Sequence, residues 1–183
     1  MGEIKSAREI AQDKADKLGN LSPEEKRKQQ EEKYKLAGRA LANKYLEKAS
    51  ANYLTSETKK YNGQDRLMVI HAIIERLLEL LDIKHNQNTQ KISEGIRAIG
   101  DSREIDIIDQ IDRLINEYQN AEAKESIRIE TEGKEILHGM RITGTAIGSI
   151  NVRANIQWNQ YIEQLCLPYQ ERLNNLKQSL LSF

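Results

Sequence analysis

The spacing of apolar residues in the C-terminal half predicts two long helices that pack as an antiparallel pair. Asp101 is followed three residues later by Glu104, the capping-box pattern that begins a helix. Apolar side chains then recur at steps of three and four, which places them on one helical face. They are Ile108, Ile111, Ile115 and Tyr118. We therefore predict a helix from Asp101 whose apolar face needs a partner.

The partner is a second apolar row, with nearly the same heptad-like step, close to the end of the chain. Its members are Trp158, Ile162, Leu165, Tyr169, Leu173, Leu176 and Leu180. Pro168 interrupts this row and predicts a kink or a short break near Leu167. In the first helix the row turns polar after Tyr118, through residues such as Glu122 and Glu125. We expect its middle turns to be solvated or paired with cations such as Lys124, Arg128 and Lys134.

A glycine-punctuated link, residues 138–149, joins the two predicted helices. Gly139, Gly144 and Gly148 suit a helix C-cap and a tight reversal, because glycine reaches positive φ without steric cost. The link is also rich in apolar residues. We predict that it folds back against the helix ends as a small plug, with a short extended piece over residues 141–143 as one option.

The N-terminal part predicts two helices of different character. Residues 3–18 place small and apolar side chains on one stripe, and Gly19 ends it. Ser22 and Glu25 flank Pro23, a strong signal that a second helix begins there. The charged segment Glu24–Lys35 has no core face and is expected to project into solvent or lie against a partner. From Leu36 to Leu54 the pattern becomes a packing stripe.

The middle of the chain predicts the core. A turn at residues 61–63 precedes a segment, residues 67–83, that is apolar on most of its circumference. A polar loop over residues 84–90 and a short helix over residues 91–99, ended by Gly100, follow it. The predicted fold is all-α: an elongated helical bundle with a long C-terminal antiparallel hairpin. We divide it into N-terminal helices in residues 1–62 and a helical core with the hairpin in residues 63–183, which fold as one cooperative domain.

Composition narrows the functional classes. The 183 residues carry 28 basic and 28 acidic side chains, so no net positive charge favours nucleic acid. The single cysteine, Cys166, excludes an intrachain disulfide framework and indicates a reducing compartment. No run of eighteen apolar residues predicts a membrane span. We interpret the chain as cytoplasmic, with myristoylation at Gly2 as a minor alternative.

Candidate chemistry is sparse. His71, His85 and His138 have no second ligand at metal-binding spacing, and Cys166 has no base at a recognisable spacing, which favours a buried inert thiol. We predict no catalytic residue, metal or cofactor. A structural role is favoured for the glycines of the link. The alternative is an anion or partner contact formed by His138, Arg141, Gly144, Gly148 and Arg153.

Three functional hypotheses follow. The leading one is a helical protein–protein interaction or assembly protein, partnered by another protein or by its own copies, because the hairpin seam is interrupted by polar residues and the apolar fraction is only 38%. The second is a cochaperone or nucleotide-exchange-like adaptor that presents a small plug on long helices. The third is a helical ligand-binding protein or enzyme with an anion pocket near Gly139–Gly148.

Overall fold

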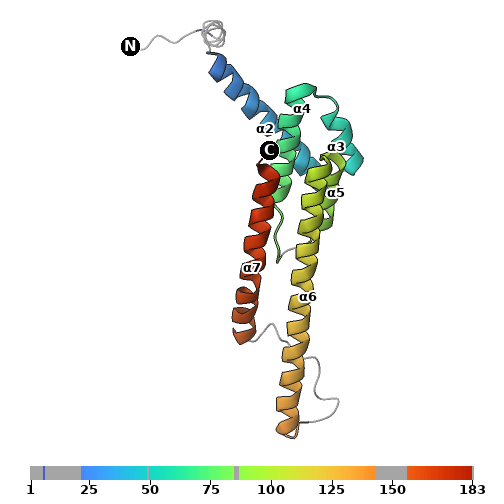
Figure 1. Ribbon diagram of the computed structural model, residues 1–183, viewed down its shortest axis with the longest axis vertical. Coiled ribbons are helices and arrows are strands. Elements are labelled where there is room, and N and C mark those ends of the chain that lie inside the picture. Colours follow the sequence, from blue (N-terminus) through green and yellow to red (C-terminus); the bar gives the residue numbers. More distant parts are fainter. Residues whose placement is uncertain (1–5, 7–21, 49, 85–86, 143–155, 183) are drawn as a thin grey trace, which may run out of the picture.

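The protein is helical throughout the part of the chain that the structure describes, as predicted. The computed structural model describes residues 6, 22–48, 50–84, 87–142 and 156–182, and within these ranges it contains no strand. The helices are α2 (Pro23–Lys48), α3 (Ala51–Thr58), α4 (Gly63–Glu79), α5 (Thr89–Ile99), α6 (Ser102–Gly139) and α7 (Ile156–Leu181). Figure 1 shows α2 to α5 gathered at one end of the molecule and the α6–α7 pair extending from them.

The centre of the core is α4, as its nearly continuous apolar sequence predicts. Its buried side chains are Val69, Ala72, Ile73, Ile74, Leu77 and Leu78. Two apolar residues of the segment, Leu67 and Leu80, are instead exposed. The second half of α2 packs against α4 through Gly38, where an added Cβ would lie 2.6 Å from the Ala72 Cβ and 2.8 Å from the Val69 carbonyl oxygen. The two helices therefore approach closely only because residue 38 lacks a side chain.

The stripe from Leu36 to Leu54 is divided between two helices, which the sequence did not predict. The helix that begins at Pro23 ends at Lys48, and α3 begins at Ala51. Leu36 is 65% exposed, and full burial in α2 begins at Gly38 and continues through Ala42 and Tyr45. Within the charged segment Glu24–Lys35, the residues up to Lys33 are exposed, whereas Tyr34 packs against the core and Gln30, Tyr34 and Lys35 contact carboxylates of α4.

The α6–α7 pair has the predicted seam. Asp101 Oδ1 accepts hydrogen bonds from the amides of Arg103 and Glu104, and the Glu104 carboxylate accepts one from the Asp101 amide, which completes the capping box. The row from Ile108 to Tyr118 is buried, and Leu173 and Leu180 of α7 are buried with it. Further along α6, Arg128 pairs with Glu125 and Glu132, as expected for the polar middle turns.

Pro168 does not break α7. The helix runs unbroken from Ile156 to Leu181. Both Pro168 and Gln164, whose carbonyl would normally bond the amide of residue 168, lie on the exposed side of the helix. Water can therefore satisfy this carbonyl, and the predicted break is unnecessary.

The end of α6 differs in detail from the prediction. Gly139 is the last helical residue, Met140 is the C-cap, and Arg141 holds the left-handed conformation, with φ of 61°. The Arg141 amide donates to the His138 carbonyl and the Ile142 amide to the Leu137 carbonyl, the Schellman pattern. Arginine thus occupies the position where glycine was expected, and Arg141 is not extended.

Other predicted elements are confirmed or lie outside the described residues. Gly63, in the predicted turn, has φ of 51°, and α5 begins at Thr89, two residues earlier than expected. Ile92 and Ile96 of α5 are buried as predicted. The helix predicted over residues 3–18 and the plug predicted after Ile142 fall in ranges that are not described.

Candidate functional site

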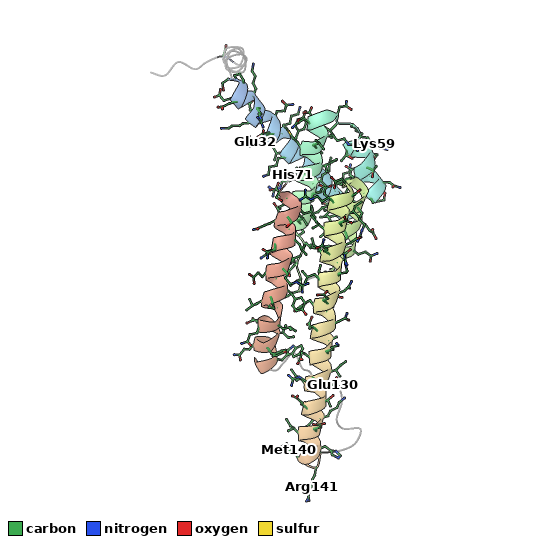
Figure 2. All side chains as sticks on the ribbon, viewed as in Figure 1. Glu32, Lys59, His71, Glu130, Met140 and Arg141 are labelled. Atoms are coloured by element: carbon green, nitrogen blue, oxygen red, sulfur yellow. The ribbon has the colours of Figure 1, made fainter. Side chains whose placement is uncertain are left out.

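The anion or partner contact predicted at the link is described only in part. His138 and Arg141 are exposed at the far end of α6, where Figure 2 shows Arg141 next to Met140. Gly144, Gly148 and Arg153 lie outside the described residues. The structure therefore does not show whether these five residues meet, and the contact stays a prediction.

Exposed apolar side chains gather on the hairpin. Nine large hydrophobic residues of the described chain are exposed, and six of them belong to α6, its C-terminal end or α7. These six are Ile127, Ile136, Met140, Ile142, Tyr161 and Leu167. No described residue from 119 to 142 is buried. The distal part of the hairpin thus offers apolar contacts to solvent instead of using them for a core.

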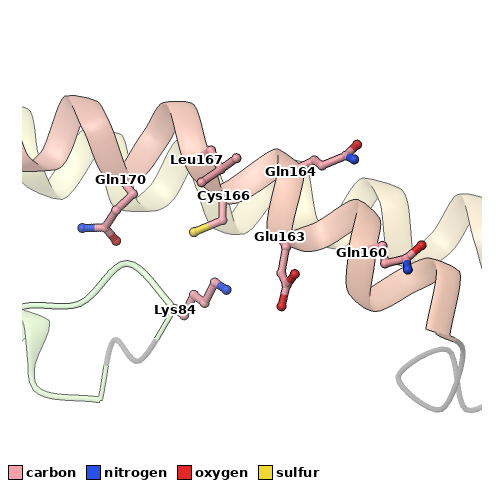
Figure 3. Close-up of a pocket in the computed structure, with 7 residues that line it drawn as sticks. All are labelled: Lys84, Gln160, Glu163, Gln164, Cys166, Leu167 and Gln170. Carbon is pink, nitrogen blue, oxygen red and sulfur yellow. The ribbon is translucent and has the colours of Figure 1, made fainter.

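A groove lies between α7 and the segment that follows α4. Its volume is about 510 Å³, and its lining comprises Lys84, Gln160, Glu163, Gln164, Cys166, Leu167 and Gln170. In Figure 3, Glu163, Cys166 and Gln170 project from α7 on the side of Lys84, whereas Leu167 and Gln164 lie at the opposite edge. One wall therefore comes from a single helix and the other from the α4–α5 connection.

Contacts of the core fix the second wall of this groove. Ile83, next to Lys84, is 1% exposed. The Lys177 ammonium of α7 donates a hydrogen bond of 2.6 Å to the Leu81 carbonyl oxygen. The Lys84 amide donates to the Asp82 carboxylate at 2.8 Å. The first of these bonds holds the α4–α5 connection against α7, and the second fixes the turn that carries Lys84.

The groove is not built for nucleophilic catalysis by its cysteine. Cys166 is buried, as the sequence predicted, and burial raises the pKa of its thiol, with Lys84 acting in the opposite direction. A thiol with a raised pKa is protonated at neutral pH and is a poor nucleophile. Lys84 and Glu163 contribute one charge of each sign, and three glutamines contribute amides, so the lining has no net charge.

Leu167 stands on an exposed row of α7 that carries little charge. The row follows steps of three and four and consists of Gln160, Gln164, Leu167, Glu171, Asn174 and Gln178, all of them exposed. Only Glu171 is charged, although 31% of the whole chain is charged. Leu167 is 68% exposed at the middle of this row. Beside the row, Glu163 lies one helical turn before Leu167, so the side chains nearest to Leu167 are amides and carboxylates.

A second groove lies between α2 and α4, with a volume of about 440 Å³. Its lining includes Leu67, Met68 and His71. The His71 Nε2 lies 3.2 Å from the Leu181 carbonyl oxygen at the end of α7. The ion pair between Lys35 of α2 and Glu75 of α4 lines this groove and joins the two helices. The groove is therefore less open to a partner than the α7 groove.

The described ranges contain neither a metal-binding cluster nor a membrane-spanning helix. No cluster of three or more His, Cys, Asp or Glu side chains is placed to hold a metal ion. None of the helices there combines the length and apolar character needed to cross a lipid bilayer.

Comparison of the chain with protein-family models, with curated proteins and with solved structures finds no match. The function must therefore be inferred from geometry. Sequence reasoning did not single out Lys84 and Leu167, because the groove forms only when the α4–α5 connection lies against α7. One signal was readable in the sequence: the row from Gln160 to Gln178, in which only Glu171 is charged, on the face opposite the predicted seam.

Proposed function

We propose that this chain is a helical interaction or assembly protein that contacts a protein partner through its α6–α7 hairpin. The observation that supports this proposal best is the concentration of exposed apolar side chains on the hairpin, six of the nine in the described chain. Ile136 and Tyr161 line one pocket of the distal hairpin, and exposed apolar residues that lie together mark interaction sites more often than single ones do.

The difference in burial between the two ends of the molecule also supports the proposal. The end formed by α2 to α5 buries most of its large apolar side chains in one core. The hairpin extends from that core, as Figure 1 shows, and has few buried residues beyond Tyr118. In a helix pair of 38 and 26 residues, the unburied turns of α6 beyond Tyr118 are well suited to reach a partner.

The test is capture of the partner with the full-length tagged chain from cells of its source, followed by mass spectrometry. The hairpin variant carries Ile127→Glu and Ile136→Glu, at positions that are each 65% exposed. The matched control carries Leu36→Glu and Leu67→Glu, at positions 65% and 64% exposed on the other end of the molecule.

We expect the hairpin variant to lose the captured protein and the control to retain it. Both variants should keep the helical circular dichroism of the natural chain, because all four positions are exposed. Retention of every captured protein by the hairpin variant, or equal loss from both variants, would rule out the distal hairpin around Ile127 and Ile136 as the contact.

A further inference from the structure

We infer that the α7 groove, lined by Lys84, Glu163 and Cys166 beside Leu167, is the docking site for a second copy of this chain, in a two-fold pair of α7 helices. This inference deepens the proposed function by naming a second copy of the chain as one partner. It rests on the proposed function in that respect alone. It names a different surface from the distal residues Ile127 and Ile136.

The first support is that a projection and a groove lie side by side on the same face. Leu167 is the most exposed large hydrophobic residue of the described chain, at 68%, and it borders a groove of about 510 Å³. A two-fold interface brings the same patch of both copies together, so that residue i contacts j and j contacts i. Each Leu167 can then fill the groove of the other copy.

The second support is charge. Glu163 lies one helical turn before Leu167, so a Leu167 that enters the groove of the other copy brings Glu163 beside the Lys84 of that copy. By two-fold symmetry this opposite-charge contact occurs twice. Within one chain, Lys84 and Glu163 make no ion pair with each other or with another described residue.

The third support is the amide content of the row. Glutamine and asparagine side chains both donate and accept hydrogen bonds, so a row rich in them can pair with a copy of itself. Pro168 has no amide hydrogen, which leaves the Gln164 carbonyl as an additional acceptor on this face. The charged residues of α7 on this face, Glu163 and Glu171, are both acidic, so the attraction between copies depends on Lys84 as the opposite charge.

The size of the surface sets the expected strength. The row from Gln160 to Gln178 is about 27 Å long at a rise of 1.5 Å per residue. A stable interface of standard size buries about 800 Å² on each partner. One helix face with a single large apolar residue falls short of this area, so we expect a weak dimer whose population depends on concentration.

The first experiment is sedimentation velocity of the full chain from micromolar to millimolar concentration. We expect the natural chain to shift from monomer to dimer, Leu167→Glu to stay monomeric, and the control Leu36→Glu to behave as the natural chain. A monomer at every concentration would overturn the inference, as would a dimer that Leu167→Glu leaves unchanged or that Leu36→Glu abolishes.

The second experiment tests whether the charged contact is between copies. Lys84→Glu alone places two carboxylates in each contact, and Glu163→Lys alone places two ammonium groups there. In an equal mixture of the two variants, each mixed dimer regains both opposite-charge contacts. We expect each variant alone to dimerise less than the natural chain and the mixture to recover. A mixture no better than its components would overturn the inference, because contacts within one chain are not repaired by mixing.

Failure of this inference and failure of the proposed function are distinguishable. If the chain is monomeric and the hairpin variant still loses a captured protein, only the dimer is wrong. If the dimer depends on Leu167 and no captured protein depends on Ile127 and Ile136, only the distal contact is wrong.

Discussion

At the scale of single residues, Gly38 sets how closely α2 and α4 pack. Gly38→Ala adds a Cβ that meets the Ala72 Cβ at 2.6 Å and a backbone carbonyl at 2.8 Å, and the backbone cannot yield cheaply. Overpacking of this kind costs about 1–3 kcal/mol, against a gain in helix propensity of about 1 kcal/mol. We expect urea unfolding to show a net loss of up to about 2 kcal/mol.

Gly139→Ala is the matched control for this prediction. Gly139 is helical, and an added Cβ there meets nothing within 4 Å. Helix propensity then acts alone, so the variant should be neutral or slightly more stable. Equal losses from both variants would show that the close approach of α2 and α4 is not what Gly38 provides.

Lys177 makes stability depend on pH. Burial lowers the pKa of Lys177, although Asp82 opposes the shift, and the side chain donates to the Leu81 carbonyl oxygen. A folded pKa below the unfolded value means that the folded state binds fewer protons, so the contribution of this group to stability rises with pH between the two values. A neutral amine can still donate to Leu81.

Lys177→Met tests this expectation. The free energy of unfolding of the natural chain minus that of the variant should rise as the pH is raised from about 8 toward about 10.4, the ordinary lysine pKa. Urea unfolding at successive pH values measures it, and the other lysines and tyrosines cancel because both proteins contain them. A difference that falls with pH would mean that the ammonium form is favoured by the fold.

At the scale of elements, the helix ends show what the sequence can and cannot predict. The start of α6 was predictable because the capping box needs only Asp101 and Glu104, three residues apart. Its end was not, because Arg141 holds a left-handed conformation that is usually taken by glycine, and the sequence offers Gly139 two residues away. The division between α2 and α3 likewise has no strong breaker, since no glycine or proline lies between Arg39 and Leu54.

Arg141→Gly should stabilise the C-terminal end of α6 against local opening. A non-glycine residue in the left-handed conformation costs about 1 kcal/mol or more, which glycine avoids. We expect the Ile142 amide, which donates to Leu137, to exchange with deuterium about fivefold more slowly, the equivalent of about 1 kcal/mol. Met140→Gly is the control: with φ of −81°, that position gains nothing from glycine and should exchange faster.

The groove beside α7 could not be predicted from the spacing of residues within single helices. Both apolar rows of the hairpin were predicted correctly from residues such as Ile111 and Leu173, because burial follows the helical period. The groove depends instead on where the α4–α5 connection lies, and that is decided by contacts such as Lys177 with Leu81, which are 96 residues apart. Local spacing carries no signal for such a contact.

At the scale of the whole molecule, stability is unevenly distributed. Buried residues are dense from Ala42 to Tyr118, whereas none of the described residues from 119 to 142 is buried. Regions with few buried apolar contacts open locally at a lower free energy than the core. The distal hairpin should therefore open before α4 and its neighbours unfold.

Trp158 reports on this opening because it is the one tryptophan of the chain. It lies near the start of α7, is 4% exposed, and lines a pocket with Ile129 and Gly133 of distal α6. In urea, its fluorescence should change at lower concentration than the circular dichroism at 222 nm, which follows all helices, so the transitions should not coincide. Hydrogen exchange supplies the control, since peptides from residues 121–142 should exchange before peptides from residues 69–96. Coincident transitions with uniform exchange would mean that the hairpin and the core unfold as one unit. The distal apolar side chains would then stabilise the fold more than their exposure predicts.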